Sequence, residues 1–167
     1  PPYQAPAGKL GIGVSTIFGA TIPVTMDGLS TGSNFGLRAK TPFSFNIAGM
    51  ETNLGTEFYL SSMSSEIGAP YKLWSLIVNA SIFPLKSIEF RGGIGLASSS
   101  IGDFQITALA LPLDMNYYLP LNISGFKFAI NMHAQRAMGY PSDEGVELGD
   151  ATDFIYLGLL IDTPLAF

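Results

Sequence analysis

Few side chains in this sequence have the chemistry of a catalyst, and the first candidate is its single histidine, His133. A hydrolase or acyltransferase would pair that imidazole with a serine and a carboxylate, because the histidine takes the serine proton while the acid holds the ring. Serines are numerous, but none stands in a recognisable motif with His133, and Ser61 and Ser62 belong to a different segment. We therefore expect a histidine satisfied within the fold and no enzyme. A lipid-modifying activity through His133 is the one catalytic alternative.

Metal ligands are also scarce. With no cysteine and one histidine, the chain has few of the ligands that transition metals prefer. One run of carboxylates could hold Ca²⁺ or Mg²⁺, but it lacks the EF-hand spacing. We expect it to be a solvated acidic loop within Arg136–Asp153, and its members are Asp143, Glu144, Glu147, Asp150 and Asp153. No metal or cofactor is expected. The net charge of −5 and the lack of a basic patch argue against nucleic acid as a partner.

The composition is apolar and poor in charge. Of 167 residues, 47% are hydrophobic and only 13% charged, about half the usual charged share of a soluble domain. Yet the longest apolar run, Phe154–Ile161, is far short of the roughly 20 residues that a membrane helix needs. Aromatic residues make up 12%, which argues against disorder. The apolar residues must therefore be spread along the chain in a regular pattern.

That pattern has a period of two, which is the period of a β-strand with one apolar face. Around Leu10, Ile12 and Val14, for example, every second residue is apolar and those between are small or polar. The same alternation predicts eight strands, most of them longer than strands of globular proteins. They cover Lys9–Val24, Asn34–Ile47, Asn53–Ser62, Lys72–Pro84, Ile88–Ser98, Phe104–Leu119, Gly125–Gln135 and Phe154–Phe167.

Charged residues fall opposite the apolar faces. A soluble sandwich or lipocalin-type barrel would carry such charges on its outside. The strand lengths and the scarcity of charge favour the inverse arrangement, an eight-stranded antiparallel up-and-down transmembrane β-barrel with its apolar face in lipid. We then expect a plugging ion-pair network in the lumen, in which Arg91 faces Asp114 and Lys9 meets Asp162. Its members are Lys9, Arg38, Lys40, Glu57, Lys72, Glu89, Arg91, Asp114, Lys127 and Asp162.

The connections predict an orientation. Those after the second, fourth and sixth strands are brief, whereas those at the other end tend to be longer. Short periplasmic turns and long outer loops are usual for such barrels, so both termini are expected on the periplasmic side. Residues 1–8 form a Pro-rich leader or linker, and residues 9–167 form the transmembrane barrel domain.

At this point the chain resembles the small outer-membrane barrels of the OmpA/OmpX/OmpW type. The resemblance covers roughly Lys9 to Phe167 and rests on architecture, together with the ending Tyr156-Leu-Gly-Leu-Leu-Ile-Asp-Thr-Pro-Leu-Ala-Phe167. That ending is similar to the signal read by the barrel-assembly machinery, with Gly158, Leu165 and Phe167 as its matching residues. Pro164 is atypical there, although a strand end tolerates proline.

The resemblance implies a protein of the bacterial outer membrane in contact with the lipid bilayer and lipopolysaccharide. It implies a non-enzymatic role that is structural, anchoring or mediated by loops, alone or with other proteins of an envelope complex. The alternative is a narrow pore or transporter for small solutes or hydrophobic molecules. The inward charges argue against an apolar conduit through the periplasmic half.

Overall fold

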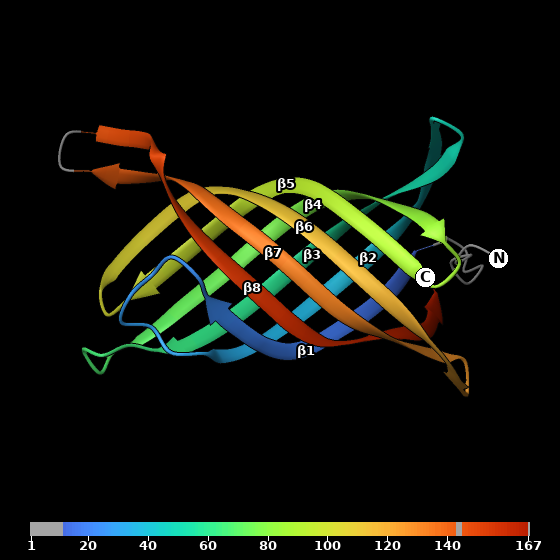
Figure 1. Ribbon diagram of the computed structural model, residues 1–167, viewed down its shortest axis with the longest axis horizontal. Coiled ribbons are helices and arrows are strands. Elements are labelled where there is room, and N and C mark those ends of the chain that lie inside the picture. The colour runs from blue at the N-terminus through green and yellow to red at the C-terminus, as the bar shows by residue number, and fades with distance from the viewer. Residues whose placement is uncertain (1–11, 143–144, 167) are drawn as a thin grey trace.

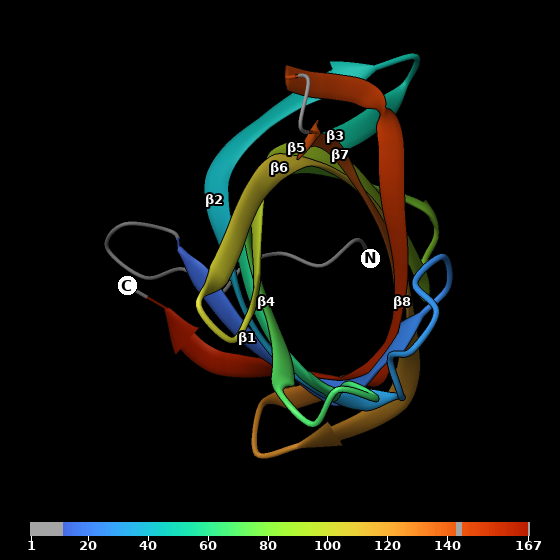
Figure 2. The same cartoon turned by 90° about the vertical axis from the view of Figure 1, so that its left-hand side faces the viewer.

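Every regular element of the computed structural model is a β-strand, and the model describes residues 12–142 and 145–166. Each strand pairs antiparallel with its neighbours in sequence, and β1 also pairs with β8, which closes the sheet into a barrel (Figure 1; Figure 2). The predicted all-β, eight-stranded, up-and-down barrel is confirmed. The strands are β1 (Gly13–Pro23), β2 (Gly32–Ile47), β3 (Met50–Ser64), β4 (Pro70–Leu85), β5 (Ile88–Ile101), β6 (Phe104–Ile123), β7 (Phe126–Ser142) and β8 (Gly145–Ala166).

The described part of the chain contains no helix long and apolar enough to cross a membrane. The strands have 11 to 22 residues, and all of them exceed the 3–10 residues typical of globular proteins. The last two are longer than predicted, because β7 runs on to Ser142 and β8 starts at Gly145. Most of the acidic run, expected to be a loop, therefore lies in a projecting hairpin, and Asp143 and Glu144 lie outside the described residues. A hairpin beyond the lipid has no need of an apolar face, so alternation does not reveal it.

The barrel has two different ends. The turn side carries both ends of the barrel sheet and the two-residue connections β2–β3, β4–β5 and β6–β7. The loop side carries the longer connections 24–31 and 65–69, together with the tight connection 102–103 and the β7–β8 hairpin. The asymmetry expected from the sequence is present, and the short β5–β6 connection is its exception on the loop side.

Two of the turns share a sequence motif. Asn46-Ile-Ala-Gly49 and Asn122-Ile-Ser-Gly125 both place their last two residues at positive φ, between 50° and 88°. A turn of this kind matches the right-handed twist of the strands that it joins. In each motif the asparagine side-chain oxygen accepts a hydrogen bond from the backbone N–H of the glycine, at 2.9 Å for Gly49 and 3.0 Å for Gly125. The motif therefore sets the register of two hairpins.

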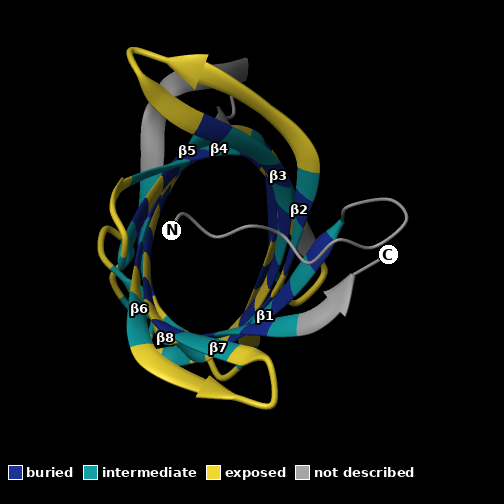
Figure 3. Cartoon of the chain, turned by 90° about the vertical axis from the view of Figure 1, so that its right-hand side faces the viewer, coloured by how far each residue is buried: buried dark blue, intermediate teal, exposed yellow. Residues whose placement is uncertain are grey.

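Burial is inverted relative to a water-soluble barrel. Large apolar side chains stand on the outer wall, with Val78 62% and Leu113 63% exposed, while arginine, glutamate and aspartate side chains line the inside. Figure 3 shows buried positions along the ring and exposed ones at the tips of the β2–β3 and β6–β7 hairpins. An apolar outer wall around a charged interior is the arrangement of a barrel that stands in lipid.

Candidate functional site

The barrel interior holds a cluster of charged side chains, which we call the lumen network. Each member lies on an inward position of its strand and is at most 5% exposed. The pairing register places Arg38 opposite Glu57 and Arg91 opposite Asp114. Because a buried charge is costly unless it is paired, these side chains must satisfy one another. The network consists of Arg38, Lys40, Glu57, Glu89, Arg91, Asp114 and Asp162.

Glu57 is the centre of the network. The Nε of Arg38 donates to its Oε1 at 2.6 Å, and Nη1 of Arg91 donates to the same oxygen. Arg91 also donates through Nη2 to Oε1 of Glu89 at 2.7 Å, and Nη1 of Arg38 lies 3.6 Å from the other oxygen of Glu89. Two arginines and two glutamates from β2, β3 and β5 thus form one four-membered ion cluster across the lumen.

Polar side chains extend this cluster toward the turn side. Glu89 Oε2 accepts hydrogen bonds from Nδ2 of Asn116 at 3.1 Å and from the hydroxyl of Tyr118 at 3.2 Å. Lys40 Nζ donates to that hydroxyl at 3.1 Å and lies 3.7 Å from Glu89 and 3.8 Å from Asp162. The side chain of Lys40 therefore links the cluster to β8 at the closing seam of the barrel.

His133 lies inside the barrel and is fully buried. Its Nδ1 is 2.7 Å from Oδ1 of Asp114, which is its register partner on β6. The rings of Tyr59 and Tyr156 pack against the imidazole with centroids 4.5 and 4.8 Å away. Among the described residues no serine is hydrogen bonded to His133, so the nucleophile that a hydrolase needs is not part of this arrangement.

The same region brings three metal-ligating side chains together. Atoms of Glu57, Asp114 and His133 that could bind a metal ion lie within 4.8 Å of one another. However, the guanidinium groups of Arg38 and Arg91 already supply positive charge to Glu57. A divalent cation would have to stand beside both, so we assign no metal to this cluster.

The loop-side half of the lumen contains a cluster of apolar side chains, which the sequence reasoning missed. Met63, Tyr71, Leu73, Phe154 and Tyr156 point inward and are at most 4% exposed. The signal was available, since all five occupy the inward register of their strands. Only charged residues of that register were predicted to lie in the lumen, and these apolar residues were not. The lumen is therefore filled by two layers. One consists of ion pairs, and in the other, toward the loop side, apolar rings and chains pack beside polar groups such as Thr21 and Ser61.

The remaining predicted network residues lie elsewhere. Lys72 was expected inside but is exposed on the outer wall, because it shares the register of Trp74 and not that of Leu73. Lys127 is half-buried near the start of β7, where its register partner is Asp162. Lys9 lies outside the described residues, and so does its predicted contact with Asp162.

One predicted pairing takes a different form. Arg91 stands opposite Asp114 in the register, but its guanidinium donates to the glutamates at 57 and 89. Asp162 accepts a hydrogen bond from the hydroxyl of Ser15 on β1. The closing seam thus has a polar contact of its own on the inward face.

The seam also requires two glycines. Gly19 of β1 and Gly158 of β8 are register partners. A Cβ atom at Gly19 would lie 2.0 Å from the carbonyl oxygen of Leu157, and one at Gly158 would lie 2.6 Å from that of Phe18. Gly158 therefore has a packing role in addition to its place in the predicted assembly signal. The side chain of Leu165, and all of Phe167, lie outside the described residues.

Solved structures share this architecture at low sequence identity. The outer membrane protein Ail of Yersinia pestis, in a phospholipid bilayer nanodisc, matches with a TM-score of 0.55 and 15% identity over 90% of this chain and 99% of that chain. The crystal structure of Neisserial surface protein A (NspA) matches with a TM-score of 0.56 and 10% identity over 92% and 96%. Ail in complex with the heparin analogue sucrose octasulfate matches with a TM-score of 0.53 and 12% identity over 91% and 96%.

No protein-family model matches the chain, and no curated protein matches its sequence. The likeness is thus one of structure, and it spans the closed barrel from end to end in both partners of each comparison. The fold of this chain is therefore that of the small eight-stranded β-barrels of the outer membrane proteins Ail and NspA.

Proposed function

We propose that the protein is an integral barrel of the bacterial outer membrane whose lumen is closed, and that it serves as an anchor for the segments that project from it. The observation that carries this proposal is the filling of the lumen. Inward side chains from β1 to β8 are almost without accessible surface, including Arg38, Arg91 and Tyr59 at 1–2% exposure. Almost none of the surface of these groups is accessible to water.

Both layers of the lumen support closure. An eight-stranded barrel is about wide enough for its own side chains to fill it. The ion cluster around Glu57 crosses the ring from β2 to β5, and the rings of Tyr71 and Phe154 approach to 6.2 Å on the loop side. A solute would have to break buried ion pairs to pass, which is strongly unfavourable.

A closed lumen leaves the projecting segments as the functional surface. We infer that they act by contact with the lipid surface, with lipopolysaccharide or with other proteins of the envelope. The Ail barrel has been solved with a heparin analogue, a polyanion. In this chain the β7–β8 segment has the carboxylates of Glu147, Asp150 and Asp153. Repulsion between like charges argues against nucleic acids as partners of this segment.

We infer no catalytic role for His133. Its Nδ1 is hydrogen bonded to Asp114, and its ring packs against the rings of Tyr59 and Tyr156. The side chain is fully buried in a lumen that offers a lipid substrate no approach. Its contacts are those of a packing residue.

Conductance across a lipid bilayer tests the closed lumen. The purified barrel is inserted into planar bilayers, and flotation of reconstituted vesicles establishes that it has entered the membrane. We expect no steady single-channel current above the bilayer baseline, whereas a sixteen-stranded porin in the same bilayers conducts. A reproducible open level from the inserted barrel would instead favour the narrow pore.

One observation favours the alternative of a hydrophobic ligand. A cavity of about 190 Å³ lies at the loop-side end and is lined by Met26, Tyr71, Ile101, Ile106 and neighbouring polar residues. It could accept a small apolar molecule. The lumen network lies between this cavity and the turn side, so the cavity is better suited to hold a molecule than to pass one through the barrel.

A further inference from the structure

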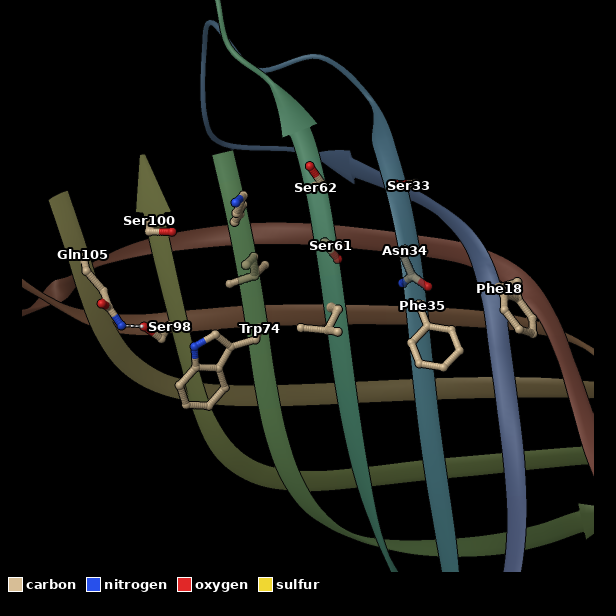
Figure 4. A pocket seen from close by; sticks show the side chains of 13 residues that line it. Phe18, Ser33, Asn34, Phe35, Ser61, Ser62, Trp74, Ser98, Ser100 and Gln105 are labelled. Atoms are coloured by element: carbon tan, nitrogen blue, oxygen red, sulfur yellow. Dashed lines mark hydrogen bonds between the residues drawn. The ribbon is translucent and has the colours of Figure 1, made fainter. Parts of the chain in front are cut away.

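The outer wall of β1 to β6 has a hollow that the closed lumen does not explain. Its volume is about 710 Å³, and its lining comes from the loop-side halves of these strands. Figure 4 shows the rings of Phe18 on β1, Phe35 on β2 and Trp74 on β4, with Ser62 and Ser100 nearer the strand ends. One side of the hollow is therefore apolar and the other side is polar.

In the strand register, most of the outward side chains of this lining form two rows. The lower, apolar row joins Phe18 to Phe35, Phe35 to Leu60 and Leu60 to Trp74, each pair being direct register partners. Because these side chains point outward, they form a continuous strip on which an acyl chain can lie. Phe18 is 51%, Leu60 44% and Trp74 36% exposed, so the strip is open to a ligand.

The upper, polar row lies two residues further toward the loop side. Its members are also register partners in sequence, and each stands within three residues of the loop-side end of its strand. The row contains hydroxyl groups, one amide and one cation, and no carboxylate. It consists of Ser33, Ser62, Lys72, Ser100 and Gln105.

Lys72 gives the polar row its charge. Among the described residues, the outward cations of the loop-side half are Lys72 and Arg136. Asp153 neutralises Arg136 through two hydrogen bonds of 2.8 Å, one from Nε and one from Nη2. No carboxylate of the described residues lies within ion-pair distance of Lys72. The Lys72 ammonium is thus free to take an anion, and the hydroxyls of Ser62 and Ser100, its register partners, can donate to that anion.

We propose that these two rows bind one phosphorylated glycolipid of the outer leaflet, a lipid A molecule, with a phosphate at Lys72 and an acyl chain along the apolar row. The inference rests on the proposed outer-membrane function, because that function places the loop side at the outer leaflet. In such a lipid the phosphate lies above the acyl chains, just as Lys72 of the polar row lies above the apolar row. An ordinary belt of interfacial aromatic residues would need neither the hollow nor the uncompensated lysine.

Trp74 makes the proposal directly measurable, because it is the only tryptophan of the chain and lies in the site. The barrel is reconstituted into phosphatidylcholine nanodiscs that contain increasing fractions of diphosphorylated lipid A, dephosphorylated lipid A or phosphatidylglycerol. We expect diphosphorylated lipid A to shift the Trp74 emission at the lowest fraction. Equal responses to the phosphorylated and dephosphorylated forms would overturn the site, and an equal response to phosphatidylglycerol would overturn the assignment to lipid A.

A lysine pair provides the matched variants. Lys72→Gln should raise the half-saturating fraction of lipid A about fivefold, the effect of losing about 1 kcal/mol of charge pairing. Lys86→Gln changes an exposed lysine on the turn side and should leave that fraction unaltered. If both variants behave like the parent, the polar row does not bind phosphate.

Flotation on the same vesicles separates the two proposals. A chain that fails to enter the bilayer contradicts the proposed membrane function itself. A chain that enters the bilayer and shows no preference among the lipids contradicts the binding site alone.

Discussion

Glu57 shows how a single carboxylate can organise the interior of a barrel. One of its oxygens accepts from both Arg38 and Arg91, and these arginines are shared in turn with Glu89. All four side chains are at most 2% exposed. In such a cluster each charge depends on the others, because a buried ion without its partner has no solvent to replace it.

At the residue scale, Glu57→Ala should therefore be strongly destabilising. The change leaves two buried guanidinium groups short of a counter-charge, and we expect the free energy of unfolding to fall by about 3–5 kcal/mol. Urea unfolding in detergent micelles, followed by circular dichroism, measures the loss. Glu51→Ala, at an exposed glutamate on the same strand, serves as the control and should unfold like the parent. Equal midpoints for the two variants would contradict the importance of the cluster.

The elements of this fold follow from alternation, but they depend on close backbone contact where the barrel closes. Gly19 and Gly158 bring β1 and β8 together at a distance that no side chain permits. A Cβ atom in this position would push the strands apart in the middle of their ladder of hydrogen bonds.

At the scale of the element, Gly19→Ala should weaken the seam. Its Cβ would meet the carbonyl oxygen of Leu157, and overpacking of this kind costs about 2 kcal/mol or more. The shift from the folded to the heat-denatured band on cold SDS gels measures the loss of barrel. Gly92→Ala is the matched control, because a Cβ on this β5 glycine has no atom within 4 Å. If Gly19→Ala resists SDS as well as this control, β1 and β8 can move apart enough to accommodate the added Cβ atom without loss of stability.

At the scale of the whole molecule, we propose that the last strand carries the signal for assembly of the barrel. We expect Phe167→Ala to reduce the amount of barrel inserted in outer membranes of cells while leaving refolding of the purified chain in detergent unchanged. A receptor-read signal acts on delivery and not on stability, and this difference separates the two roles. Western blots of membrane fractions beside refolding yields provide the comparison. A parallel loss in both measurements would indicate a structural role for the residue.

Sequence alone predicted the strands and the closed barrel because lipid demands an apolar residue at every second position. Beyond the lipid the alternation is lost, so the extension of β7 and β8 into a hairpin past Gln135 was not predicted. The charged cluster of the lumen was predicted from the same alternation, whereas the apolar cluster with Met63 and Leu73 was not. The prediction that Lys72 points into the lumen was wrong. Lys72 and Trp74 are two residues apart and therefore lie on the same side of the sheet, which is the outer wall. The pairing of Arg91 with Glu57 needed the structure, because long side chains reach past their register partners.

The ion cluster also governs the order in which the barrel can form. Its groups come from β2, β3 and β5, and the seam contact joins Ser15 to Asp162 across 147 positions of the chain. These non-local contacts make folding slow, since distant segments must meet before their interactions repay the loss of chain entropy. A half-formed sheet inside the bilayer would expose arginine side chains to hydrocarbon, at a high cost in free energy. Insertion and closure must therefore be one concerted event, and a partly inserted intermediate should not accumulate.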